Sequence, residues 1–218
     1  MSRESLSAHE GHSPEPVLAD VEVGGMTRGS FMLRGALAAG SIYGLSAVTP
    51  FVSSALAAEA GSGDAEILNF ALTLEYLEAD FYNVKGREVG LSGTAKTYAK
   101  QFGEEEQQHV EALIAAVKQL GGKPVAKPKF AFPVTDEKSF LKLASLLENT
   151  GVSAYNGAAP SVQSKQVLAA AGGIVQVEAR HAAAINLLIE QSPTPTMGFD
   201  APLTKAQVLA KAGPLIKA

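Results

Sequence analysis

Residues 104–111 read EEEQQHVE and place Glu106 three residues before His109 within a run of helix-favouring residues. Taken alone, this run is ambiguous, because glutamate is common on solvated helix surfaces and a Glu-x-x-His match has little specificity. The same spacing recurs in EARH, where Glu178 precedes His181 by three residues. Of the four histidines in the chain, the two outside the N-terminal segment both follow a glutamate at this spacing. The recurrence favours two paired ligand sets over a solvated acidic face.

Two further glutamates precede these pairs in the same order. Glu75 stands seven residues before Tyr82, and Glu148 stands seven residues before Tyr155. The separation from Glu75 to Glu106 is nearly equal to the separation from Glu148 to Glu178. Internal duplication of a helix pair produces such a pattern, so the sequence predicts two similar halves.

Helical periodicity and capping signals predict an all-α protein beyond Ala60. The predicted helices cover residues 64–85, 94–120, 135–157 and 160–191, with a short C-terminal helix at 204–212. Asp64 is the expected N-cap of the first helix. The links within each helix pair are short, whereas the irregular linker KPVAKPKFAFPV between the pairs is long enough to cross a bundle. The expected fold is a four-helix bundle of two antiparallel hairpins joined by a long crossover.

Helical geometry predicts which acidic and histidine side chains face the core, because neighbours three, four and seven residues away share a face. The repeated glutamates and both histidines have mostly apolar neighbours, which predicts that they are buried. These six residues are Glu75, Glu106, His109, Glu148, Glu178 and His181. Glu105 shares its face with two glutamines and a tyrosine, so it is expected to face solvent. Glu78 shares its face with apolar residues and with Lys85, and it stays an alternative to Glu75.

Buried ionised carboxylates require a compensating charge, because leaving them unpaired costs several kcal/mol each. The predicted core positions carry no lysine or arginine that could pair with them. The chain has no cysteine, which excludes disulfides, thiol catalysis, iron–sulfur clusters and cysteine zinc sites. Carboxylate and imidazole ligands suit iron or manganese, with zinc as a further alternative. The sequence therefore predicts a dinuclear metal centre inside the bundle.

Three stretches resemble the ferritin-like superfamily: LNFALTLEYLEADFYNVKG, the E-x-x-H-V-E-x-L pattern that begins at Glu106, and APLTKAQVLAKAGP. The resemblance covers about residues 64–191, and it is closest to the ferritin-like family that includes desiccation-related proteins. It implies a ferritin-like four-helix bundle that binds two Fe ions, with Mn as the alternative. The implied metal ligands are Glu75, Glu106, His109, Glu148, Glu178 and His181. It also implies that Tyr82 and Tyr155 lie just outside the ligands, although both also fit as plain core aromatics.

The resemblance leaves several functions open. The leading expectation is a di-iron or di-manganese oxidoreductase, ferroxidase or peroxidase-like, that oxidises Fe(II) or reduces peroxide or O2 in extracytoplasmic stress protection. Because the chain lacks cysteine, it has no fused rubredoxin-like donor, and a separate electron donor is expected. The alternatives are a non-catalytic stress or desiccation-related structural protein with a stabilising metal site, and a manganese catalase. A homo-oligomer is also open.

The N-terminal segment, Met1 to Ala60, differs in character from the rest. Residues 1–26 are rich in Ser, Glu, Gly and Pro without apolar periodicity and are expected to form a disordered leader. Residues 27–60 have the layout of an export signal, with Arg28 and Arg34 before a small-residue apolar stretch and Ala-x-Ala cleavage candidates. The stretch TRGSFMLRG resembles a twin-arginine (Tat) signal, except that Gly29 stands where the second arginine belongs. An exported periplasmic or cell-envelope protein is expected, with an uncleaved membrane anchor as the alternative.

The charge distribution argues against two classes of partner. Of the 22 acidic and 18 basic side chains in the chain, six and three respectively lie between Met1 and Ala60, which leaves 16 acidic and 15 basic side chains for the remainder. Because the residues after Ala60 carry nearly balanced charge and no long basic run, they give no electrostatic basis for binding nucleic acid or anionic lipid. Contact with a membrane is expected only through the N-terminal segment.

Overall fold

The computed structural model of the chain describes residues 22–23, 26–27 and 62–217. Near the N-terminus, β1 (Glu22–Val23) pairs with β2 (Met26–Thr27) in an antiparallel two-stranded sheet. This small pair falls where the sequence predicts a leader without regular structure and the start of an export signal. The rest of both predicted segments lies outside the described residues.

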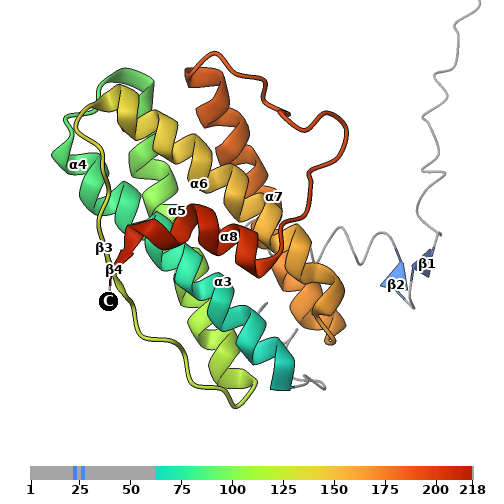
Figure 1. Cartoon of the computed structure of the whole chain (residues 1–218). Helices are drawn as coiled ribbons and strands as arrows, with labels where there is room; N and C mark the ends of the chain where they lie inside the picture. The colour runs from blue at the N-terminus through green and yellow to red at the C-terminus, as the bar shows by residue number, and fades with distance from the viewer. Residues whose placement is uncertain (1–21, 24–25, 28–61, 218) are drawn as a thin grey trace, which may run out of the picture. The chain divides into compact units, whose positions relative to one another are not determined.

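The C-terminal unit is a four-helix bundle, as the sequence predicts (Figure 1). Its long helices are α3 (Ser62–Asp80), α5 (Gly93–Gln119), α6 (Glu137–Ala158) and α7 (Lys165–Leu188). Helix α3 packs mainly against α5, and α6 packs mainly against α7. The linker between α5 and α6 runs along the bundle and joins the two hairpins (Figure 1). The all-α ferritin-like architecture predicted from the sequence is confirmed.

Short elements complete this unit. A π-helix, η1 (Phe81–Lys85), and α4 (Gly86–Glu88) follow α3, and a 3₁₀ turn, η2 (Ala159–Ser161), follows α6. The C-terminal segment contains α8 (Lys205–Ala212), the 3₁₀ turn η3 (Gly213–Leu215) and β4 (Ile216–Lys217). Strand β4 pairs antiparallel with β3 (Lys129–Phe130) in the crossover linker. The predicted C-terminal helix is therefore present, and the end of the described chain is tied to the crossover.

Two predicted helix starts need correction. The fourth helix begins at Lys165 rather than Pro160, because Pro160 lies in the 3₁₀ turn and Ser164 caps the helix by accepting a hydrogen bond from the Val167 N–H. Asp64 does not cap its own helix, which begins at Ser62. Its carboxylate instead accepts hydrogen bonds from the backbone N–H groups of Gln163 and Ser164, both at 2.9 Å. Asp64 therefore ties the start of α3 to the start of α7.

Helix α8 lies across the bundle and contacts α6 (Figure 1). The segment before it docks through the Leu203 N–H, which donates to the Ser153 carbonyl at 2.9 Å. At this point a Cβ on Gly157 would lie 1.9 Å from the Leu203 carbonyl oxygen, so only glycine allows the approach.

Buried apolar side chains form two separate clusters in the bundle. One cluster includes Phe81 and Phe140, whose rings stack with centroids 4.3 Å apart. The other includes Leu72 and Val117. A charged side chain that is buried among such residues loses its contact with water, so it needs a proton, a counter-charge or a metal ion to compensate its charge. Within the described residues, no helix combines the length and apolar character needed to cross a membrane.

Candidate metal centre

Each long helix contributes one glutamate to a buried cluster in the middle of the bundle. Helix α3 supplies Glu75, α5 supplies Glu106, α6 supplies Glu148 and α7 supplies Glu178, and all four have no exposed surface. Their carboxylates lie among the two histidines, His109 and His181, which follow a glutamate by three residues on α5 and α7. Because residues three apart share a helix face, each Glu-x-x-His pair points inward together. The structure thus brings together all six residues that the sequence singles out.

The six residues form two overlapping donor sets, in each of which one donor atom per residue lies within 4.8 Å of the others. The first set contains Glu75, Glu106, His109 and Glu178. The second set contains Glu106, Glu148, Glu178 and His181. Glu106 and Glu178 belong to both sets and come from the two helices that carry the Glu-x-x-His pairs. This arrangement suits two neighbouring cations that share two carboxylates.

The histidine nitrogens that face the centre are surrounded by carboxylate oxygens. His109 Nδ1 lies 2.9 Å from Glu178 Oε1, 3.1 Å from Glu106 Oε2 and 3.2 Å from Glu75 Oε2. His181 Nδ1 lies 2.8 Å from Glu106 Oε1 and 3.6 Å from Glu148 Oε2. One N–H proton cannot serve three acceptors well, whereas a divalent cation can accept electron pairs from the nitrogen and several oxygens at once.

Two tyrosines donate hydrogen bonds to Glu75 and Glu148, the two glutamates that each belong to only one of the two donor sets. The Tyr82 hydroxyl donates to Glu148 Oε1, and the Tyr155 hydroxyl donates to Glu75 Oε1, both at 2.5 Å. Each tyrosine reaches from one hairpin to a glutamate of the other, so the repeat seen in the sequence appears as a two-fold relationship in space. In each case the second carboxylate oxygen stays directed to the centre.

The pKa values show that protons compensate the charge of the metal-free cluster. Burial raises the pKa of Glu75 to about 7, although attraction to His109 opposes the shift. Burial and the neighbouring carboxylates also raise the pKa of Glu178 well above its ordinary value. Burial acts in the same direction on Glu106, but attraction to His109 and His181, together with the hydrogen bond from His109, outweighs it and lowers the Glu106 pKa. The carboxylates hold the pKa of both histidines above the ordinary value despite burial.

Several buried polar atoms of the cluster make no hydrogen bond of acceptable geometry, although some lie within 3 Å of another polar atom. Among the described residues these are Glu106 Oε1, Glu148 Oε2, both Glu178 oxygens and His181 Nδ1. Unsatisfied buried acceptors are costly unless a ligand or ion completes them. All five atoms belong to residues of the second donor set, and they are of the types that bind Fe or Mn. The donor chemistry therefore fits a metal pair.

Glu105 is a site residue that the sequence interpretation missed. It was expected to face solvent, but its side chain is only 31% exposed and its Oε2 lies 2.7 Å from His181 Nε2. Phe102 stacks on the same imidazole with ring centroids 4.0 Å apart. The helical-face argument compares residues of one helix and cannot show this contact, which depends on how α5 and α7 face each other. In the second half of the repeat, the position that matches Glu105 is Val177.

Glu78 is a fifth buried carboxylate beside the cluster. It lies one turn after Glu75 and is 3% exposed. The repeat aligns it with Gly151, and a Cβ on Gly151 would lie 3.3 Å from Glu78 Oε1 and 3.6 Å from Glu178 Oε2. Burial, followed by repulsion from Glu178 and Glu148, raises the pKa of Glu78 well above its ordinary value. Glu75 belongs to a donor set and Glu78 does not, and the lack of a side chain at Gly151 leaves room for Glu78 beside Glu178.

Comparison with known proteins agrees with this geometry. No curated protein matches the chain. The family described as "Ferritin-like domain" matches residues 63–191, which include the four long helices, apart from the first residue of α3, and all six donor residues. The chain therefore belongs to the ferritin-like domain family.

Proposed function

We propose that the chain binds two transition-metal ions, preferentially iron, and uses them to oxidise Fe(II) or to reduce peroxide or O2. The observation that carries this proposal is the pair of buried donor sets that share Glu106 and Glu178. Two shared carboxylates suit adjacent cations, and the mixture of carboxylate and imidazole donors suits iron, with manganese as the alternative.

The donor sets support a proposed role for each residue. Glu75 and His109 would hold one ion, and Glu148 and His181 would hold the other. Glu106 and Glu178 would lie between the two ions. When bound, two redox-active ions supply two electrons at one place, which matches the two-electron reduction of peroxide.

The surrounding residues restrain the ligand side chains and shield them from solvent. Tyr82 and Tyr155 each restrain one oxygen of Glu148 and Glu75, which leaves the other oxygen directed inward. The ligand carboxylates have side chains at most 1% exposed, whereas the His109 side chain is 11% exposed. A molecule as small as O2 or peroxide would therefore approach from the side of His109.

The proposed reaction also needs an electron donor and a cellular location. Because the chain lacks cysteine, it carries no thiolate-bound iron of its own, and a separate donor would return electrons to the centre. The proposed setting is outside the cytoplasm, supported by the export-signal layout of residues 27–60. The desiccation-related resemblance supports a role in stress protection.

Anaerobic titration with Fe(II), followed by mixing with O2 or peroxide, tests the proposal. The expected result is saturation at two Fe(II) per chain and rapid oxidation. Both should be lost in Glu106→Ala and His181→Ala. Glu104→Gln, an exposed neighbour on the same helix, is the matched control and should behave like the native chain. Full oxidation activity in the Glu106 and His181 variants would contradict the proposal.

The near-complete burial of the ligands also favours a second candidate, a metal site that only stabilises the bundle. Metal-loaded protein would then melt at a higher temperature but would turn over neither Fe(II) nor peroxide. Rapid O2 evolution from peroxide by the manganese-loaded protein would instead indicate a manganese catalase.

A further inference from the structure

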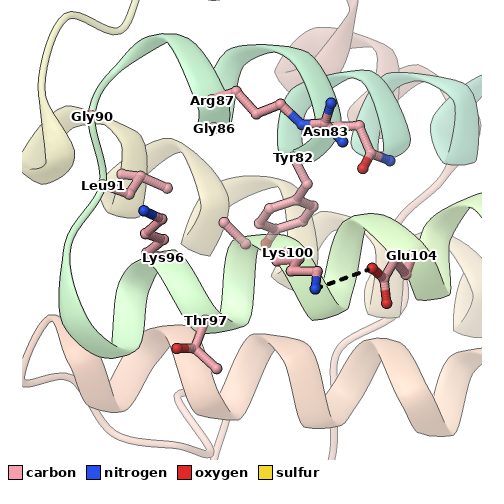
Figure 2. Close-up of a pocket in the computed structure, with 11 residues that line it drawn as sticks. Tyr82, Asn83, Gly86, Arg87, Gly90, Leu91, Lys96, Thr97, Lys100 and Glu104 are labelled. Atoms are coloured by element: carbon pink, nitrogen blue, oxygen red, sulfur yellow. Dashed lines mark ion pairs between the residues drawn. The ribbon is translucent and has the colours of Figure 1, made fainter.

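A pocket separate from the donor sets opens at the end of the first hairpin (Figure 2). Its volume is about 650 Å³, which is within the range of small-molecule sites. The π-helix η1, the short helix α4, the loop after it and the first half of α5 form its walls. Single π-helical turns inside long helices occur frequently at functional sites, because they change which side chains face a given direction.

The pocket floor is apolar and preformed. Tyr82, Leu91 and Ala99 line it and are each at most 7% exposed. Gly86 also lines it, and a Cβ there would meet the Phe140 ring at 3.4 Å and the Ala99 Cβ at 3.5 Å. The floor therefore belongs to the packed core and would hold its shape when a ligand enters.

The pocket rim is cationic. Arg87, Lys96 and Lys100 line it together with one acid, Glu104. Lys100 Nζ lies 4.0 Å from Glu104 Oε1, and both side chains are well exposed, so this pair is weak (Figure 2). Within residues 62–217, no carboxylate lies within 4.0 Å of the charged groups of Arg87 or Lys96. Two cations are thus available to bind an anion above an apolar floor.

Tyr82 forms a shared wall between the pocket and the candidate metal centre. Tyr82 is one of the residues that line the pocket, and its hydroxyl donates to Glu148 Oε1 at 2.5 Å. A molecule that packs on the Tyr82 ring would be separated from a donor-set carboxylate by one side chain.

We propose that this pocket binds a small organic anion with a flat apolar body. The body packs on Tyr82 and Leu91, and the combined positive charge of Arg87 and Lys96 attracts the anionic group. Figure 2 shows Lys96 extending toward Leu91 and Arg87 extending toward Asn83, so the cations lie on two sides of the pocket. The proposal does not depend on the redox function, because none of its contacts involves a metal ligand.

Three probes test the chemistry on the full, metal-free chain by calorimetric titration. The first is 2-naphthoate, which has both the flat body and the carboxylate. The second is 2-naphthalenemethanol, which lacks the charge, and the third is inorganic phosphate, which lacks the body. The expected result is one naphthoate per chain, with the other two probes bound at least tenfold more weakly. Absence of naphthoate binding, or equal binding of the neutral analogue, would overturn the proposal.

Substitutions then place the binding site. Arg87→Gln combined with Lys96→Gln should weaken naphthoate binding at least tenfold. Lys118→Gln, an exposed cation near the other end of α5, should leave it unchanged. Naphthoate should also shift the NMR methyl signals of Leu91 but not those of the exposed Leu146. Equal weakening by the control, or a shift at Leu146 alone, would place the ligand elsewhere and contradict the proposal.

Discussion

Glu105 Oε2 lies 2.7 Å from His181 Nε2, and no carboxylate stands at the matching position of the repeat, which is Val177. A carboxylate on the outer nitrogen fixes the orientation of a histidine and makes its inner nitrogen a better metal ligand. Among the described residues, His181 has this support and His109 does not, although the donor sets are otherwise alike. The two halves of the centre are therefore chemically unequal.

This inequality predicts unequal metal affinities. Glu105→Ala should weaken the binding of one ion by about tenfold to a hundredfold, the usual effect of removing such a partner, and should leave the other ion nearly unaffected. Competition with a chelator, followed at increasing ratios of metal to protein, measures both affinities. Glu104→Gln controls for the loss of an acidic residue from α5. Equal weakening of both ions would argue against a specific role for Glu105.

The fifth buried carboxylate, Glu78, leads to a second prediction. Burial and the neighbouring carboxylates raise the pKa of Glu78 well above its ordinary value, which favours its neutral form in the metal-free protein. Glutamine has the shape of that neutral form, so Glu78→Gln should change metal-free stability by less than about 1 kcal/mol. The same substitution removes a negative charge that becomes available once cations enter, so metal affinity should fall. Urea unfolding of the metal-free protein and metal titration of both proteins measure the two effects. Unchanged affinity would mean that Glu78 only fills the space opposite Gly151.

The two tyrosine hydrogen bonds lead to a third prediction. Tyr82→Phe and Tyr155→Phe each remove a donor from a buried carboxylate, which should cost about 1–3 kcal/mol of unfolding free energy. Tyr98→Phe is the matched control, since Tyr98 stacks on Phe102 but its hydroxyl makes no hydrogen bond among the described residues. Urea unfolding curves measure all three. Similar losses of unfolding free energy in all three variants would show that the hydrogen bonds to Glu148 and Glu75 do not stabilise the fold more than an ordinary tyrosine hydroxyl does.

The sequence predicts those parts of the site that depend on a single helix. Glu106 and His109 share one face of an α-helix, so spacing predicts their joint burial, and the repeat identifies Glu178 and His181 in the same way. Glu75 and Glu78 are harder to separate. They lie one turn apart on a broad apolar face, and the structure buries both.

Contacts between helices were not predictable in this way. The Glu105 contact depends on the packing of α5 against α7, and the bridge from Asp64 to the start of α7 depends on the meeting of two distant helix ends. The π-helix at Phe81–Lys85 was also missed, because its residues have no composition that separates them from an ordinary α-helix. Helical periodicity therefore predicted the donor residues, and only the packed structure revealed their partners.

The buried carboxylates predict that the metal-free protein loses stability as pH rises. The pKa of Glu75 is raised from 4.5 to about 7 in the folded state. Above pH 4.5 the unfolded chain releases this proton while the folded chain retains it, so the stabilisation is complete below pH 4.5 and is lost as pH rises through 7. The shift corresponds to at most about 3 kcal/mol. The raised histidine pKa values act in the same direction, and the lowered pKa of Glu106 acts only below the ordinary carboxylate range.

Urea unfolding of the metal-free protein between pH 5 and 8 measures this loss, and Glu75→Gln should flatten the profile because glutamine carries no titrating proton. Metal-loaded protein should show the opposite trend, since cations compete with the same protons and bind more tightly as pH rises. Metal binding near pH 6 should therefore release protons, which calorimetry in buffers of different ionisation enthalpy detects. A metal-free protein that becomes more stable from pH 5 to 8 would show that the cluster is ionised without metal, and the charge balance derived for Glu75 would be wrong.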